Sequence, residues 1–137
     1  MKPENIVITE GDYRRLESLI ESSRRLHRRD ADRVDGLEQE LERAIVVESG
    51  EVSPDVVTMN SRVRIEDLES SREMAYRIVF PNEANVTENR ISVLAPMGTA
   101  LLGARAGATV EWKAPSGMRR FRVLEVEYQP EAVGAAA

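Results

Sequence analysis

The feature that most constrains the fold of this chain is a change in the spacing of its apolar residues near residue 52. Before this point, apolar side chains recur every three or four residues, which is the repeat of an amphipathic helix. After it, short segments rich in β-branched and aromatic residues alternate with polar residues, which is typical of half-buried strands. Ser49-Gly50 and Ser53-Pro54 mark the change. We therefore expect an α+β protein with two segments, residues 1–52 and 53–137.

The first segment predicts an antiparallel helical hairpin. Thr9 is a suitable N-cap for the first helix, and Asp12 stands three residues later, as in a variant of the capping box. A short polar link from about His27 to Asp32 joins two apolar stripes, and Asp30 or Asp32 can cap the second helix. At 1.5 Å per residue each arm is about 25 Å long, which describes a short coiled coil. The stripes are Tyr13, Leu16, Leu19, Ile20 and Leu26, then Val34, Leu37, Leu41, Ala44 and Ile45.

The second segment predicts a small antiparallel sheet with one short helix. A change of phase in the last strand requires a bulge near Val123-Leu124, and Pro115-Ser116-Gly117 suits a tight turn before that strand. Pro96 and two glycines bound a short helical turn over residues 98–103. The expected strands are Val56–Met59, Arg62–Glu66, Met74–Phe80, Ile91–Leu94, Ala108–Lys113 and Arg119–Tyr128.

Composition excludes most catalytic chemistry. The chain has no cysteine and one histidine, so disulfides, thiolate nucleophiles, Cys-based zinc sites and sites with two imidazoles are excluded. We expect no enzyme activity, no cofactor and no metal. The net charge of −5 gives no general attraction to nucleic acid or to an anionic membrane. The N-terminal residues lack the apolar run of a secretory signal, so a cytoplasmic location is expected.

Three strings of the second segment, residues 55–63, 91–103 and 124–131, resemble the Rnk family of bacterial regulators of nucleoside diphosphate kinase. That family is similar to the Gre-type transcript-cleavage factors. The resemblance implies an FKBP-like C-terminal domain that docks on RNA polymerase and a hairpin directed into the secondary channel. Gre-type factors have a longer hairpin, whose acidic tip helps to hold a second catalytic magnesium. Rnk-type proteins are expected to compete for the channel without provoking cleavage.

The segment around the short helix is the candidate polymerase-binding surface. Pro96 and the glycines fix its backbone, and Met97 offers an adaptable apolar contact. In the alternative interpretation, Leu101 and Leu102 only fill the core beneath the sheet. We expect both to hold, with a leucine inward and Pro96, Met97 and Ala100 outward. The predicted partner-binding residues are Ala95, Pro96, Met97, Gly98, Ala100 and Leu101.

The hairpin tip is a second candidate region, with Arg28, Arg29, Asp30 and Asp32 as its predicted residues. Oxygen ligands from its aspartates could hold magnesium, but the interleaved arginines repel a divalent ion, so N-capping and local ion pairs are favoured. The basic run over residues 24–29 is either a solvated face balanced by neighbouring acids or a contact for acidic polymerase surfaces, nucleotide phosphates or transcript. A phosphorylated His27 is disfavoured, because no phosphate cradle surrounds it.

The preferred hypothesis is a noncatalytic transcription regulator that binds RNA polymerase near the secondary channel and competes with Gre-type elongation factors. Nucleic acid would be contacted only within the polymerase complex, and no membrane is involved. An alternative is a direct regulator of nucleoside diphosphate kinase or another metabolic enzyme. A prolyl isomerase, by analogy with the FKBP-like fold, lacks an aromatic-lined proline pocket in the sequence, and fold does not carry function.

Overall fold

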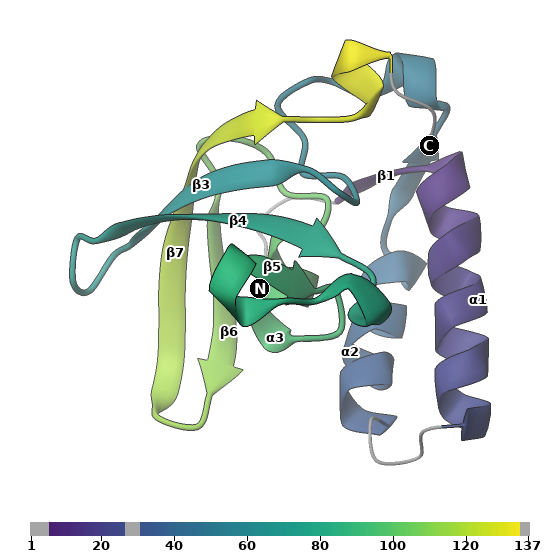
Figure 1. Cartoon of the computed structure of the whole chain (residues 1–137), viewed down its shortest axis with the longest axis horizontal. Coiled ribbons are helices and arrows are strands. Elements are labelled where there is room, and N and C mark those ends of the chain that lie inside the picture. Colours follow the sequence, from purple (N-terminus) through teal and green to yellow (C-terminus); the bar gives the residue numbers. More distant parts are fainter. Residues whose placement is uncertain (1–5, 27–30, 135–137) are drawn as a thin grey trace.

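The structure is a computed structural model that describes residues 6–26 and 31–134. Two helices lie beside a curled sheet, and a short third helix sits beneath the sheet (Figure 1). No helix in these ranges is long and apolar enough to cross a bilayer. The helices and strands are β1 (Val7–Thr9), α1 (Glu10–Leu26), α2 (Ala31–Glu42), β2 (Ile45–Val47), β3 (Arg62–Asp67), β4 (Glu73–Val79), β5 (Arg90–Ser92), α3 (Pro96–Leu101), β6 (Thr109–Ala114) and β7 (Gly117–Tyr128), with four 3₁₀ turns at Ser49–Glu51, Pro81–Glu83, Val86–Glu88 and Glu131–Val133.

The predicted helical hairpin is present. The Thr9 side-chain oxygen accepts a hydrogen bond from the Asp12 amide at 3.2 Å, which confirms the predicted cap of α1. The two helices run antiparallel and pack through one buried stripe on each. Asp32 lies inside the first turn of α2, so it is not the cap of that helix. The buried apolar residues of the stripes are Leu16 and Ile20 on α1 and Val34, Leu37 and Leu41 on α2.

The second helix ends earlier than predicted, because a turn at Arg43 follows Glu42 and the chain then enters the strand β2 at Ile45. β2 pairs in parallel with β1, and the Ile45 amide donates to the Ile6 carbonyl oxygen at 2.8 Å. The prediction that the apolar stripe of the helix extends to Ile45 was therefore wrong. Three consecutive β-branched residues favour a strand, and the partner strand lies before α1, out of reach of any local pattern.

The main sheet has the strand order β5-β4-β3-β7-β6. β5 is parallel to β4 and the other pairs are antiparallel, so the sheet is mixed rather than purely antiparallel as predicted. The predicted strand Val56–Met59 is wrong, since this segment is a buried loop with a single bridge from Val56 to Arg105. Its apolar residues fill the core without joining a ladder of strands.

Both local features predicted for β7 are present. Arg64 pairs with Glu125 and the next residue, Ile65, pairs with Val123, which leaves Leu124 as the extra residue of a bulge. A two-residue turn at Pro115-Ser116 joins β6 to β7, and Gly117 follows it with φ +122°, a backbone conformation that favours glycine.

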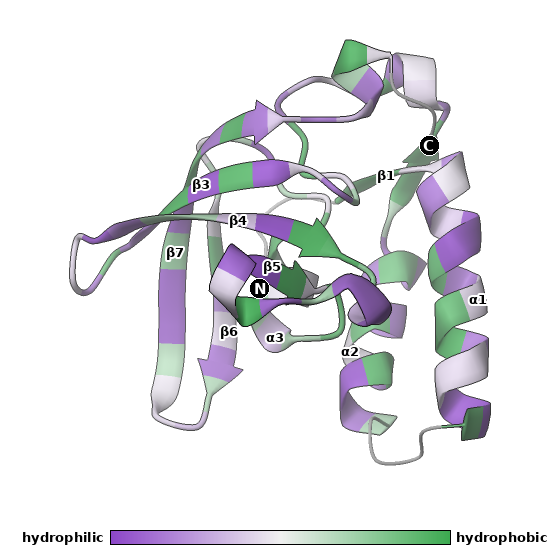
Figure 2. Cartoon of the chain, viewed as in Figure 1, coloured by the Kyte–Doolittle hydropathy of each residue, from purple (hydrophilic) through white to green (hydrophobic). Residues whose placement is uncertain are grey.

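One apolar core joins the helices to the sheet. Its buried cluster includes Leu16 and Leu37 from the hairpin together with Val63 and Phe121 from the sheet. Apolar residues accordingly gather where the helices face the sheet (Figure 2). Among the aromatic residues of the sheet, Trp112 stacks on Phe121 with ring centroids 4.7 Å apart, and Phe80 is half-buried against the cluster. Tyr128 lies against the Arg77 guanidinium, which is 5.1 Å from the centroid of its ring.

Candidate partner-binding site

The segment that leads into α3 has a fixed backbone. Pro96 occupies the first turn of the helix, where its missing amide hydrogen costs nothing. The Thr99 amide donates to the Ala95 carbonyl at 2.9 Å, and the Thr99 hydroxyl donates to the Val93 carbonyl at 2.6 Å. A partner therefore meets a surface that is already ordered, which lowers the entropic cost of binding.

Gly98 brings α3 into direct contact with Ser92 at the end of β5. A Cβ atom placed on this residue would lie 2.1 Å from the Ser92 carbonyl oxygen, a distance that side chains do not tolerate. Only glycine fits at this position without moving the helix. The glycine predicted as a backbone determinant is thus required by packing.

Only some of the predicted partner-binding residues are exposed to solvent, and only these can contact a partner. Pro96 is exposed, and Ala95, Met97 and Ala100 are half-buried with part of their surface in solvent. Gly98 and Leu101 are buried, so they support the surface from beneath and offer no side chain to a partner. Leu102 is also buried, so both leucines point inward, where one was expected to do so. Binding by the segment stays a prediction.

Two hollows flank α3, and Trp112 contributes to both. The first, of about 340 Å³, is lined by Met74, Tyr76, Met97 and Trp112, with an ion pair between Asp67 and Arg119 at its edge. The second, of about 560 Å³, lies between α2, α3 and β6 and includes Pro96, Ala100 and Trp112. The helix is therefore a ridge between two partly apolar depressions, a shape that can accept protruding side chains.

The Asp67 carboxylate at the edge of the first hollow is held in its ionised form. Its Oδ1 accepts a hydrogen bond from the Glu69 amide at 2.9 Å, and its Oδ2 pairs with Arg119. The Glu69 amide first, and then the Arg119 guanidinium, lower the pKa of Asp67 below its ordinary value of 3.8. Arg119 in turn lies over the Phe121 ring, 5.5 Å from the centroid. Asp67 and Arg119 therefore form a fixed ion pair at the edge of the first hollow.

At the hairpin tip, Arg28, Arg29 and Asp30 lie outside the described residues, as does His27. Asp32 lies in the first turn of α2. Two other described acids near the tip are engaged with Arg24, which binds Glu38 at 2.8 and 3.0 Å and also pairs with Asp35. These bonds, led by that to Glu38, raise the pKa of Arg24. Arg24 thus matches the interpretation of the basic run as a balanced, solvated face. The described residues contain no group of acidic or histidine side chains that could hold a metal ion.

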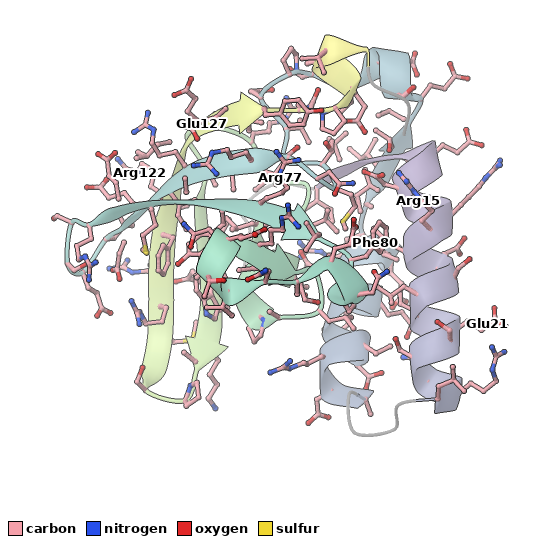
Figure 3. The ribbon with its side chains drawn as sticks, viewed as in Figure 1. Arg15, Glu21, Arg77, Phe80, Arg122 and Glu127 are labelled. Carbon is pink, nitrogen blue, oxygen red and sulfur yellow. The ribbon has the colours of Figure 1, made fainter. Side chains whose placement is uncertain are left out.

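Sequence reasoning missed a buried polar junction between the hairpin and the sheet. The Asp12 carboxylate is 1% exposed and accepts hydrogen bonds from the Met59 amide at 3.0 Å and from Arg15 at 2.7 Å. Burial raises the pKa of Asp12, and the Met59 amide opposes this. Arg15 also lies over the Phe80 ring at the end of β4, as Figure 3 shows. Only the capping position of Asp12 was visible in the sequence.

Two family models together match most of the chain. The model described as "Rnk N-terminus" matches residues 4–47, and "Transcription elongation factor, GreA/GreB, C-term" matches residues 52–128.

Individual relatives agree with these matches. The chain is 38% identical over 135 residues to "Regulator of nucleoside diphosphate kinase" of Escherichia coli, covering 98% of this chain and 97% of that protein. It is 38% identical over 112 residues to "Transcription inhibitor protein Gfh1" of Thermus thermophilus, covering 80% of this chain and 70% of that protein. Among solved structures, "Prokaryotic transcription elongation factor GreA/GreB from Nitrosomonas europaea" superposes with a TM-score of 0.74 at 41% identity, covering 90% of this chain and 99% of that one.

Proposed function

This chain belongs to the Rnk family and carries a GreA/GreB-type C-terminal segment, and we propose that it regulates transcription by binding RNA polymerase without contributing a catalytic group. The names of its relatives, a transcription inhibitor and a transcription elongation factor, support a role in transcription. The proposal places the protein in the cytoplasm, where the polymerase is. The FKBP-like character of the sheet is part of the same proposal.

The observation that carries the proposal is the ordered surface of α3. Pro96, Met97 and Ala100 stand on a ridge between two hollows, and the backbone beneath them is fixed by Thr99 and Gly98. Adaptable apolar groups on a rigid support are typical of the centre of a protein interface. We assign this surface, composed of Ala95, Pro96, Met97 and Ala100, as the polymerase contact, and call it the α3 ridge.

The proposed mechanism is occupancy near the secondary channel. The protein competes there with Gre-type elongation factors and alters access to the channel. The acids Asp35 and Glu38 are bound to Arg24, which leaves them poorly suited to hold a catalytic magnesium. α1 has 17 residues, about 25 Å at 1.5 Å per residue, and packs against α2, so the hairpin is short.

A binding assay with purified RNA polymerase tests the contact. Met97→Asp places a charge on the α3 ridge and should weaken binding about 30-fold or more, the loss that a central interface residue of about 2 kcal/mol produces. Val133→Asp is the matched control, because Val133 is 63% exposed in the 3₁₀ turn Glu131–Val133 and lines neither hollow beside α3, so this variant should bind as the wild type does. Ala100→Arg is a second variant of the ridge. Equal binding by Met97→Asp, Ala100→Arg and wild type, with all three folded, would refute the contact.

A competition assay tests the mechanism. Increasing amounts of the protein should displace a labelled Gre-type factor from stalled elongation complexes and should suppress the cleavage that this factor provokes. The protein alone should leave the transcript length unchanged. Transcript shortening by the purified protein, lost on Asp32→Ala, would show instead that the tip takes part in catalysis.

The name of the Escherichia coli relative favours a second candidate, direct regulation of nucleoside diphosphate kinase. This activity needs no polymerase. Co-elution of the two purified proteins on gel filtration, with a changed rate of nucleotide turnover by the kinase, would support it. Absence of co-elution at micromolar concentrations would contradict direct regulation of the kinase. If the protein also binds polymerase, the transcription proposal is the one that stands.

A further inference from the structure

The inner face of the sheet is longer than the elements that cover it. On β4, Ile78 is fully buried, whereas Tyr76 and Met74, which follow on the same face, are half-buried. On β6, Val110 is fully buried and Trp112 is half-buried. The first hollow, of about 340 Å³, is the uncovered end of this face.

The apolar lining of the first hollow is of the kind that binds small rings. The chain has one tryptophan, three tyrosines and two phenylalanines, and one residue of each kind lines this hollow. Aromatic rings offer flat faces for stacking, and methionine side chains adapt to the shape of a guest. The apolar side chains of the lining are Met74, Tyr76, Met97, Trp112 and Phe121.

A buried nitrogen beside these rings lacks a hydrogen-bond acceptor. Arg119 lines the hollow, and its Nε atom is buried and has no hydrogen-bond partner among the described residues. Nη2 of the same guanidinium pairs with Asp67, and the guanidinium carbon lies 5.5 Å from the centroid of the Phe121 ring. A buried donor without an acceptor is costly, and native proteins seldom leave one. A ligand oxygen atom bound in the hollow would satisfy it.

The charges that line the hollow favour an anion. Arg72 is exposed, and within the described part of the chain it makes no ion pair. Its carbonyl oxygen accepts a hydrogen bond from the Asp67 amide at 2.8 Å, so Arg72 and Arg119 both adjoin Asp67. The Asp67 carboxylate is already bound on both oxygens, by the Glu69 amide and by Arg119. Two cations and one carboxylate line the hollow, which leaves a net positive charge.

We propose that the first hollow is a binding site for a small aromatic carboxylate. The ring lies against Trp112 between Met74 and Met97, and the carboxylate accepts a hydrogen bond from Nε of Arg119 and pairs with Arg72. A cavity of about 150 Å³ holds benzene, so 340 Å³ leaves room for one ring and a short acid chain. The inference goes beyond the proposed function, because binding needs this chain alone and no polymerase.

The single tryptophan of the chain reports binding. Because Trp112 lines the hollow, titration of the full-length chain with phenylpropionate should change its fluorescence saturably, with a Kd of about 1 mM or lower. Phenylpropionamide has the same ring without the charge and should bind about tenfold more weakly. Propionate has the charge without the ring and should give no saturable change.

One pair of variants tests the charge. Arg72→Gln should weaken the binding of phenylpropionate about fivefold and leave that of the amide unchanged. Arg122→Gln is the matched control, because Arg122 is an exposed cation on the opposite face of the sheet from Phe121 and stands away from the helices in Figure 3. This control should bind both compounds as the wild type does.

A second pair of variants tests the place. Ala114 lines the hollow and is half-buried, so Ala114→Phe should fill the hollow and abolish binding. Ala75→Phe is the matched control, because Ala75 is also half-buried but alternates with Met74 and Tyr76 on β4 and does not line the hollow. Circular dichroism establishes that both variants are folded.

Saturable binding of phenylpropionate that Arg72→Gln weakens and folded Ala114→Phe abolishes would support the site. No saturable change up to about 20 mM with folded wild-type protein would overturn it, as would equal binding of the acid and the amide. Binding retained by folded Ala114→Phe would place the ligand elsewhere and would also overturn it. Tighter binding by a tripeptide that ends in phenylalanine would assign the site to a peptide terminus and overturn the assignment to a small molecule.

Discussion

The Asp12 carboxylate lies almost fully buried where α1 meets the loop over residues 58–61. It accepts a hydrogen bond from the Met59 amide and another from Arg15 of its own helix. In the same loop the Thr58 hydroxyl donates to Glu131 at 2.8 Å. A buried amide that loses its acceptor is costly, so a single carboxylate ties the helix to the sheet.

Two substitutions of Asp12 separate the effect of its hydrogen bond to the Met59 amide from the effect of its buried charge. Asp12→Ala leaves the buried Met59 amide without an acceptor and should lower the free energy of unfolding by about 2 kcal/mol. Asp12→Asn keeps an acceptor and removes the buried charge, so it should cost less than the alanine variant. Chemical denaturation of both variants, with the exposed Asp35→Ala as control, measures the difference. An equal loss for the alanine and asparagine variants would contradict the role of the hydrogen bond.

The pH dependence of stability should carry opposite contributions from two acids. The pKa of Asp67 is lowered below 3.8 in the folded state, so its contribution is complete above 3.8 and is lost as the pH falls through the lowered value. The pKa of Asp12 is raised, so its ionisation weakens the fold as the pH rises from 3.8 through the raised value. Unfolding curves across acidic pH should therefore show Asp67→Asn destabilised most at neutral pH and approaching wild type in acid. A constant difference would contradict this.

At the scale of elements, patterns with local causes were predictable. The stripes of α1 and α2 depend on a repeat of three to four residues, the β6–β7 turn on a proline and a glycine, and the bulge at Leu124 on a change of phase within one strand. A short helix was also predicted this way, because proline and glycine bound it in the sequence, although α3 spans Pro96–Leu101 and the expected turn covered residues 98–103.

Features with distant causes could not be predicted. β1 and β2 are three residues each and are stabilised by pairing across the whole hairpin. The loop over residues 56–59 has the apolar composition of a strand, but its amides bond to Asp12 and to the Ala104 carbonyl instead of a neighbouring strand. The second hollow at the site joins α2 to β6, and nothing in the local sequence of either indicates that they meet.

The two helical glycines should respond oppositely to alanine. Gly36→Ala meets open space and should raise the stability by up to about 1 kcal/mol through helix propensity. Gly98→Ala places a Cβ on the Ser92 carbonyl and should destabilise the protein or displace α3, with weaker polymerase binding. Melting temperatures of the two variants test this. A stabilised Gly98→Ala would show that the contact between α3 and β5 is less close than described.

At the scale of the whole molecule, the helices and the sheet share their interior. Leu16 and Leu37 of the hairpin are fully buried in the same cluster as Val63 and Val110 of the sheet. Neither part can be removed without exposing apolar surface of the other, and a shared core of this kind favours cooperative unfolding.

A substitution that destabilises the hairpin should therefore also lower the stability of the sheet. Leu37→Ala removes a fully buried side chain of α2 and should cost about 2–5 kcal/mol. The single tryptophan, Trp112 on β6, reports unfolding of the sheet by fluorescence, while circular dichroism near 222 nm reports the helices. Both signals should shift together in the variant. A shift of the helical signal alone would show that the two parts unfold independently.

The pairing of β1 with β2 also bears on how such a molecule can change in evolution or by design. Val7–Thr9 leads into the hairpin and Ile45–Val47 leads out of it, side by side, so both connections to the rest of the chain sit at one end of the helices. Equal insertions into α1 and α2 at the ends that lie far from β1 and β2 would lengthen the helical hairpin and leave the paired strands β1 and β2 in place. The length of the hairpin is thus an independent variable in this architecture, adjustable in whole helical turns while the α3 ridge keeps its shape.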